Sequence, residues 1–364
     1  MHRLSVRPPA SVRAAAKTGV FLLKVLPMLP SRPLDRLTPA PLVERVTYPT
    51  PHGSTEGDLY RPAADGPHPG VVVCLGVVPF GQDHPQVPRL GEALARSGFA
   101  ALLYWSPAMR DFRLVPEDIE GIAQVYRWLV ERPDVDPARS GLIGTCVGGS
   151  FALMAAASSL IRDRVAFVAA FAPYSSMWTL ARQVASSTRI AGETSERWDV
   201  DQLTRRVYVR SLTDGLDPRE AELLRSGPAE HVGQNDVRRL STTGRAVAPL
   251  LTALSADEAE TALHRLPTAM QERLTALSPA SYLADLTAPL VVLAHDRDDP
   301  VIPAGESRRL QAALAGRAGV RYTEFVMFKH MDPTKVRLSP LRLLRELGKF
   351  YGWLYPVFRQ VEAP

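Results

Sequence analysis

The stretch LIGTCVGGSFAL, residues 142–153, decides how the rest of the sequence is interpreted. An apolar run ends at GTCVGG (144–149), and a second run of apolar and small residues follows. This order is typical of a buried strand that turns sharply into a helix, with Cys146 at the apex of the turn. Glycines at 144 and 148, two positions to either side, allow the strand and the helix to approach closely. The sequence therefore predicts an elbow that presents a thiol.

A thiol at this apex has two interpretations. At the N-terminus of the following helix, the positive end of the helix dipole favours the thiolate, so Cys146 is a candidate nucleophile. The alternative is a small buried residue without a chemical role. The chain has two cysteines, and Cys74 lies in the apolar run VVVCLG (71–76), where we expect it to pack in the core. Disulfides are therefore not expected, and a reducing, cytoplasmic compartment is the default.

Strand-like and helix-like segments alternate on both sides of the elbow. This alternation predicts an α/β fold with a mostly parallel central sheet and helices on both faces. Strands are expected at 42–50, 54–62, 71–76, 99–105, 140–144, 164–174, 289–296 and 320–328, and helices at 86–98, 116–132 and 305–316.

The chain is expected to divide into three parts. Residues 1–41 form an N-terminal amphipathic extension, 42–177 and 287–364 form the α/β core, and 178–286 form an inserted helical cap. Within the cap the pattern predicts charged helices and no strand. Trp178 and Trp198 are candidate pocket aromatics, although core packing is the more ordinary role for each.

A nucleophile needs a base and an acid, and both candidates follow the elbow in the chain. The stretch HDRDDPVIP comes directly after a buried strand and offers Asp296, Asp298 and Asp299 at the carboxyl end of that strand, where catalytic groups collect. We favour Asp299, because the turn DPVIP leads into the next helix; the other two are alternative turn formers. FKHMDP places His330 just after the last strand, as the candidate base. His295 is expected to be structural.

The oxyanion hole is expected to use backbone N–H groups. Val147 follows the nucleophile and supplies one, and Val77 or Val78, in the loop after the first buried strand, supplies the second. Asp83 and His84 in the same loop are expected to be a solvated pair rather than substrate contacts.

Together these motifs resemble the α/β-hydrolase fold and, more narrowly, the dienelactone hydrolase family. The resemblance covers roughly residues 42–177 and 287–352 and rests on GSTEGDLYRPAADGPHPGVVVCLG, GTCVGG, AHDRDDPVIP and FKHMDP. That family carries a Cys-Asp-His triad in G-x-C-x-G-G, so the resemblance implies Cys146 as nucleophile, Asp299 as acid and His330 as base. The family has a carboxylate near the thiol at the position of Val77, and it lacks the long helical insertion.

A weaker resemblance is to polyhydroxyalkanoate synthases and other acyltransferases with a cysteine nucleophile. They share G-x-C-x-G-G, the insertion point and the triad spacing. Their histidine follows a glycine where Lys329 stands here, and their Asp-Trp pair corresponds to Tyr104-Trp105-Ser106.

Three functions follow from these observations. The first is a hydrolase that cleaves a carboxylic ester, lactone or thioester through an acyl-cysteine intermediate. The second is acyl transfer, and the third is a non-catalytic hydrolase-fold protein that binds a ligand under its cap. No metal or organic cofactor is implied, and the expected partner is a small-molecule substrate.

Charge and the two ends of the chain limit the other partners. The 43 basic and 38 acidic residues give a net charge of +5 without a long single-sign run, so nucleic acid is not expected. The amphipathic segments 11–30 and 339–359 have basic and apolar faces, and the first is too short to span a bilayer. They either pack on the body of the protein or contact a membrane surface.

Overall fold

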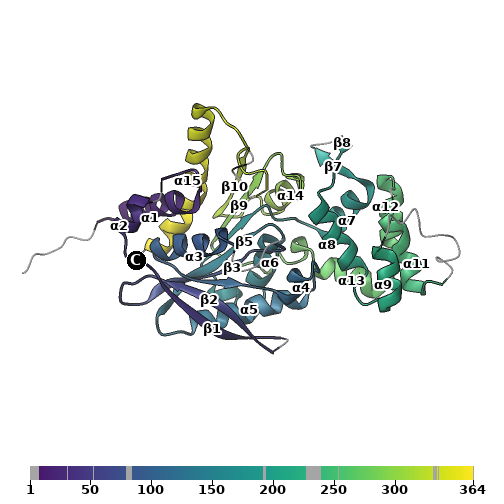
Figure 1. The fold of residues 1–364 in the computed structure, drawn as a ribbon, viewed down its shortest axis with the longest axis horizontal. Helices are drawn as coiled ribbons and strands as arrows, with labels where there is room; N and C mark the ends of the chain where they lie inside the picture. Colours follow the sequence, from purple (N-terminus) through teal and green to yellow (C-terminus); the bar gives the residue numbers. More distant parts are fainter. Residues whose placement is uncertain are drawn as a thin grey trace, which may run out of the picture.

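The centre of the molecule is an eight-stranded sheet with the order β1-β2-β4-β3-β5-β6-β9-β10 (Figure 1). Neighbouring strands from β4 to β10 are parallel, and β1 and β2 add an antiparallel edge. In this computed structural model the described residues are 8–30, 32–51, 53–78, 84–191, 194–226, 239–252, 254–330, 334 and 336–363. The strands are β1 (Leu42–Thr50), β2 (Gly53–Arg61), β3 (His68–Cys74), β4 (Ala100–Tyr104), β5 (Val135–Thr145), β6 (Phe167–Phe171), β9 (Leu290–Asp296) and β10 (Val320–Phe325).

Helices cover both faces of this sheet. One face packs against α1 (Ala10–Val25), α3 (Gln86–Arg96) and α15 (Pro340–Glu362), and the other against α5 (Glu117–Val130), α6 (Val147–Ala156) and α14 (Gly305–Ala313). Strands β4, β6 and β9 are buried at every position, which explains their unbroken apolar runs. The α/β class and the parallel sheet expected from the alternation are confirmed. The short elements are α2 (Arg32–Leu37), α4 (Pro107–Arg110) and the 3-10 turns η1 (Arg162–Arg164) and η4 (Pro279–Ser281).

Between β6 and β9 the chain forms a separate group of helices at one end of the sheet, drawn in green at the right of Figure 1. We call residues 177–278 the β6–β9 insertion. Its elements are α7 (Met177–Ser186), β7 (Thr188–Ala191), β8 (Thr194–Arg197), α8 (Gln202–Leu212), α9 (Pro218–Arg225), α11 (Thr242–Val247), η3 (Ala248–Leu251), α12 (Ala256–His264) and α13 (Thr268–Ala276).

The expectation that this region holds no strand was wrong. β7 and β8 form a short antiparallel hairpin in which Thr188 pairs with Arg197 and Ala191 with Thr194. The sequence pattern does not reveal it because the hairpin has four residues a strand and β8 is exposed throughout, so neither a buried face nor an apolar alternation marks it.

The first and last residues of the insertion are bonded to each other and to the core. The Met177 amide donates to Ser278 Oγ (2.8 Å), and the Ala280 amide donates to the Ser175 carbonyl (3.0 Å). The insertion therefore leaves and rejoins the core at one place.

A buried carboxylate holds this junction. Glu306 of α14 has no exposed surface, and it accepts hydrogen bonds from the amides of Ser175 (3.0 Å) and Ser176 (3.3 Å) and from Gln183 Nε2 (2.7 Å). Arg309 pairs with the same carboxylate. Glu306 thus ties the start of the insertion to the core helix α14.

We expect Glu306→Ala to lower the free energy of unfolding by about 3 kcal/mol, because several buried donors would lose their acceptor at once. Urea unfolding followed by circular dichroism measures the change. Glu131→Ala is the matched control, since Glu131 is exposed and its ion pairs with Arg127 and Arg164 are long (3.8 Å each), and it should cost less than about 1 kcal/mol. Equal losses in the two variants would show that Glu306 does not hold the junction.

The basic side chains of α1 bind carboxylates of the body. Arg13 and Lys17 both pair with Glu362 at the end of α15, and Lys24 pairs with Asp35 and with Glu92 of α3. If residues 11–30 pack on the body of the protein, contacts of this kind are expected. Contact of the same residues with a membrane surface stays a prediction. Among the described residues, no helix combines the length and the apolar character needed to cross a bilayer.

Candidate active site

Cys146 stands at a sharp turn between β5 and α6. Its backbone has φ 56° and ψ −138°, a conformation that L-residues rarely adopt. A Cβ on Gly148 would lie 2.2 Å from the Cys74 carbonyl oxygen, and one on Gly144 would lie 2.3 Å from the Gly148 carbonyl oxygen. Both positions therefore require glycine, and the elbow expected from the sequence is present.

The structure brings Cys146, His330 and Asp299 together. His330 lies beyond the end of β10, and its Nδ1 is 2.8 Å from Asp299 Oδ2. The Cys146 thiol lies close enough to the imidazole to favour its charged form. Because Nδ1 faces the carboxylate, Nε2 is the nitrogen left for the thiol. The imidazole thus lies between the thiol and the carboxylate and is hydrogen-bonded to the carboxylate.

The Asp299 carboxylate is fully buried and fixed on both oxygens. Oδ1 accepts hydrogen bonds from the amides of Val301 (2.7 Å) and Ile302 (3.0 Å), while Oδ2 faces His330. Burial alone would raise the pKa of this carboxyl, but the His330 charge and these hydrogen bonds bring the pKa below its usual value. Asp299 is therefore an anion that faces the imidazole.

The electrostatics of His330 are set by its two partners. Burial disfavours the imidazolium, but the charges of Cys146 and Asp299 and the hydrogen bond to Asp299 outweigh it, so the pKa of His330 lies well above its ordinary value. The imidazole is thus a strong proton acceptor beside the thiol.

The other two aspartates of the HDRDDPVIP stretch have different positions. Asp298 is exposed, and its amide donates to Asp296 Oδ1 (3.1 Å). Asp296 is buried, and its Oδ2 accepts the Phe328 amide at 2.6 Å. Lys329 and His330 both have positive φ, at 34° and 60°. Asp296 therefore anchors the strained backbone that presents the histidine.

The anchoring role of Asp296 was missed by the sequence analysis, although a signal for it exists. Asp296 is the last residue of the fully buried strand β9. A carboxylate in that place must find hydrogen-bond donors nearby, since an unpaired buried charge is costly.

His295 has a structural environment. It has no exposed surface, its Nε2 lies 2.8 Å from the Ile302 carbonyl, and its Nδ1 lies 2.6 Å from Ser307 Oγ. Burial lowers the pKa of His295, which favours the neutral ring. His295 therefore supports the turn that holds Asp299 and does not contact the thiol.

The candidate oxyanion donors lie around the elbow. Val147 is the first residue of α6, where backbone N–H groups have no acceptor within the helix. Val77 lines the same cavity as Cys146, whereas Val78 borders a separate small pocket beside Tyr104 and Trp105. Of the two alternatives for the second donor, Val77 is thus the one beside the thiol. Asp83 lies outside the described residues, and His84 accepts a weak hydrogen bond from the Gln86 amide (3.4 Å).

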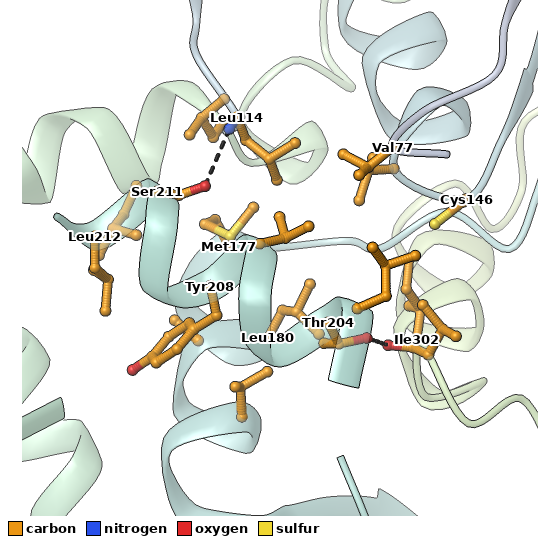
Figure 2. Close-up of a pocket in the computed structure, with 18 of the residues that line it drawn as sticks. Val77, Leu114, Cys146, Met177, Leu180, Thr204, Tyr208, Ser211, Leu212 and Ile302 are labelled. Atoms are coloured by element: carbon orange, nitrogen blue, oxygen red, sulfur yellow. Dashed lines mark hydrogen bonds between the residues drawn. The ribbon is translucent and has the colours of Figure 1, made fainter. Parts of the chain in front are cut away.

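A cavity of about 80 Å³ begins at the thiol and runs between the core and the insertion (Figure 2). Most of the lining side chains are aliphatic or methionine, and most of the lining residues belong to α7, α8 and α13. The lining residues are Val77, Leu114, Cys146, Val147, Met177, Leu180, Ala181, Val184, Leu203, Thr204, Val207, Tyr208, Ser211, Leu212, Met270, Arg273, Leu274, Leu277, Val301 and Ile302.

Neither candidate tryptophan belongs to this wall. The Trp178 ring packs beside His264 and its Nε1 donates to Thr275, while the buried Trp198 donates to the Pro300 carbonyl (3.1 Å). Within the described ranges, no three His, Cys, Asp or Glu side chains are grouped to hold a metal ion.

Comparisons with known proteins give the context of this site. Residues 122–214 match the family described as "Putative esterase", a stretch that includes the elbow but neither Asp299 nor His330 and covers less than half of the chain. A search of curated proteins gives no significant match.

Similar solved structures include an acylaminoacyl peptidase, with a TM-score of 0.54, 15% identity, and coverage of 89% of this chain and 43% of that one. A puromycin-hydrolysing peptidase of Mycobacterium tuberculosis has a TM-score of 0.50 and 17% identity, and the match covers 86% of this chain and 40% of that one. A protein titled "Putative Dienelactone Hydrolase" from Klebsiella pneumoniae has a TM-score of 0.48 and 14% identity, and the match covers 86% of this chain and 98% of that one. The chain thus spans less than half the length of the two peptidases.

The mostly parallel sheet with helices on both faces agrees with the fold of the acylaminoacyl peptidase. At this level of identity the likeness concerns the fold and not the activity. The protein has the α/β-hydrolase fold.

Proposed function

We propose that the protein is a hydrolase that cleaves a carboxylic ester, lactone or thioester through an acyl-cysteine intermediate. The observation that carries the proposal is the position of His330, which lies beside the Cys146 thiol and is bonded through Nδ1 to the buried Asp299. A nucleophilic acyl-transfer site consists of a nucleophile, a base beside it and an acid that orients the base.

The geometry suggests the following steps. His330 Nε2 takes the thiol proton as sulfur attacks the carbonyl carbon, and the C–O π electrons move to oxygen. The backbone N–H groups of Val147 and Val77 stabilise this oxyanion. Collapse of the tetrahedral species breaks the bond to the alcohol or thiol, which leaves with the proton from His330.

The second half of the reaction repeats these roles. His330 takes a proton from water, the resulting hydroxide attacks the acyl-thioester, and the C–S bond breaks. The carboxylic acid departs, and the proton returns to the Cys146 sulfur. Asp299 stays ionised throughout, because it stabilises the imidazolium and holds the ring by Nδ1.

We expect a panel of aryl esters and acyl thioesters to leave an acyl group on one peptide, the one that contains Cys146. The reaction is quenched with acid within the first turnover, and intact-mass and peptide spectrometry give the added mass and its position. Cys74 serves as an internal control, since it is buried and burial raises the pKa of its thiol, so it should carry no acyl group.

The same experiment separates the three candidate functions. Steady release of carboxylic acid in water supports hydrolysis, whereas product that forms only after an added alcohol or thiol is supplied would favour acyl transfer. Absence of both the acyl-enzyme and turnover across the panel would contradict the proposal and leave a non-catalytic binding protein.

A further inference from the structure

The direction of the cavity identifies which part of a substrate it receives. Cys146 lies at one side of the lining, and Ser211, Leu212 and Tyr208 lie at the opposite side (Figure 2). His330 is not among the lining residues, and 14% of its side chain is exposed. The leaving group must meet His330, because His330 protonates it. The group inside the cavity is therefore the acyl part, on the far side of the carbonyl carbon.

The length of the cavity follows from helix α8. Thr204, Val207 and Ser211 line it on successive turns of this helix. The seven steps from residue 204 to residue 211 rise about 10 Å at 1.5 Å per residue. Thr204 Oγ1 donates to the Val301 carbonyl (2.9 Å), beside the acid turn, so one end of this wall is next to the catalytic residues. An extended chain of several methylenes fits along such a wall.

The chemistry of the cavity favours an apolar occupant. The polar side chains of its wall are bonded elsewhere: Thr204 to Val301, Tyr208 OH to the Leu250 carbonyl (3.0 Å), and Ser211 Oγ to the Leu114 amide (3.0 Å). A polar ligand would lose its hydration without a partner, while an apolar chain gains by leaving water.

Arg273 lines the cavity and belongs to a group of charged residues beside Leu114. Arg273 donates to the Leu114 carbonyl (2.9 Å) and to Asp214 Oδ2 (2.9 Å), and Arg113 donates to Asp214 Oδ1 (2.8 Å). These contacts join the core loop before α5 to α13 and to the residues after α8. They set a limit to the length of the chain that the cavity holds.

We propose that the cavity along α8 binds the acyl chain of the substrate, and that the protein acts on esters or thioesters of medium-chain, unbranched carboxylic acids. This inference rests on the proposed acyl-cysteine function.

The first test is a series of p-nitrophenyl esters of acetic, butyric, octanoic and palmitic acids. We expect kcat/KM to rise about fourfold for each added methylene while the chain stays within the cavity, and to fall for palmitate. A flat profile, or a preference for acetate, would overturn the inference.

A matched pair of variants tests the position of the chain. Val207 lines the cavity, and Val209, two residues along the same helix, does not. We expect Val207→Phe to lower the octanoate-to-acetate ratio of kcat/KM at least tenfold and Val209→Phe to change this ratio less than twofold. An unchanged ratio in Val207→Phe, with its fold intact by circular dichroism, would place the chain elsewhere.

A second measurement does not depend on ester cleavage. Methyl and octyl methanethiosulfonate each convert a thiolate into a mixed disulfide and release methanesulfinate, so the rate at Cys146 reports whether an octyl chain enters beside it. We expect the octyl reagent to react at least tenfold faster than the methyl reagent, relative to a small free thiol, and Val207→Phe to remove this preference.

The two measurements distinguish the inference from the function on which it rests. An octyl preference at Cys146 without hydrolysis of any ester would contradict the proposed function and keep the cavity assignment. Acyl-enzyme formation with no chain-length preference in either measurement would keep the function and contradict the inference.

Discussion

Cys146→Ala is expected to abolish the acyl-enzyme and to lower kcat for every ester by about 10⁴-fold or more. The covalent route requires a nucleophile at the elbow, and alanine offers none, while the oxyanion donors and the cavity remain. Intact-mass spectrometry after mixing with an activated ester measures the adduct, and p-nitrophenol release measures turnover. The change removes one sulfur atom from a partly enclosed site, so the fold should survive.

The control for this result is Cys74→Ala, which removes the other thiol. Cys74 lies at the end of β3 in the core, so this variant should lose some stability but retain the adduct. Cys146→Ser should keep a small activity at most, because a hydroxyl depends more heavily on His330 for deprotonation. Undiminished hydrolysis by Cys146→Ala would remove the thiol from the mechanism.

Asp299→Asn is expected to lower kcat by about 10³- to 10⁴-fold. In the structure the carboxylate accepts the proton of His330 Nδ1, which leaves Nε2 free to take the thiol proton. An amide that turns its N–H groups toward Nδ1 reverses the tautomer and places the ring proton on Nε2. The ring then faces the thiol as a donor and no longer serves as the base.

Asp298→Asn is the matched control, because it makes the same chemical change one residue away. Asp298 is exposed, and its amide, rather than its carboxylate, contacts Asp296, so we expect less than a threefold change in kcat. Ester turnover and the urea midpoint of each variant are measured together. Equal losses of turnover in both variants, or a loss in Asp298→Asn alone, would mean that the acid is another residue.

The sequence reveals this site only at positions where the backbone geometry restricts the residue type. At the elbow, Gly144 and Gly148 are necessary because a side chain at either place would collide with main-chain atoms. Such a requirement leaves a short local pattern, and the pattern is readable without a structure. The buried strands are equally readable, because strands covered on both faces are apolar throughout.

Contacts between distant segments leave no such pattern. Asp296, Asp298 and Asp299 are chemically equivalent in the sequence, and they differ in the structure only by what packs over them. The cavity combines α7 and α8 with α13, which lies far along the chain from both, so its apolar wall is visible only after these helices pack. The hairpin of β7 and β8 is missed for another reason, since it has four residues a strand, β8 is exposed, and no apolar alternation marks it.

The way in which the β6–β9 insertion joins the core has a consequence for how such proteins diversify. Its two ends meet at the bonds from Met177 to Ser278 and from Ala280 to Ser175. A segment whose ends are adjacent is exchangeable as a unit, because a short turn bridges the same gap without disturbing the sheet. The thiol, the imidazole and the carboxylate all belong to the core. Recombination at this junction would therefore replace the specificity wall and inherit the reaction unchanged.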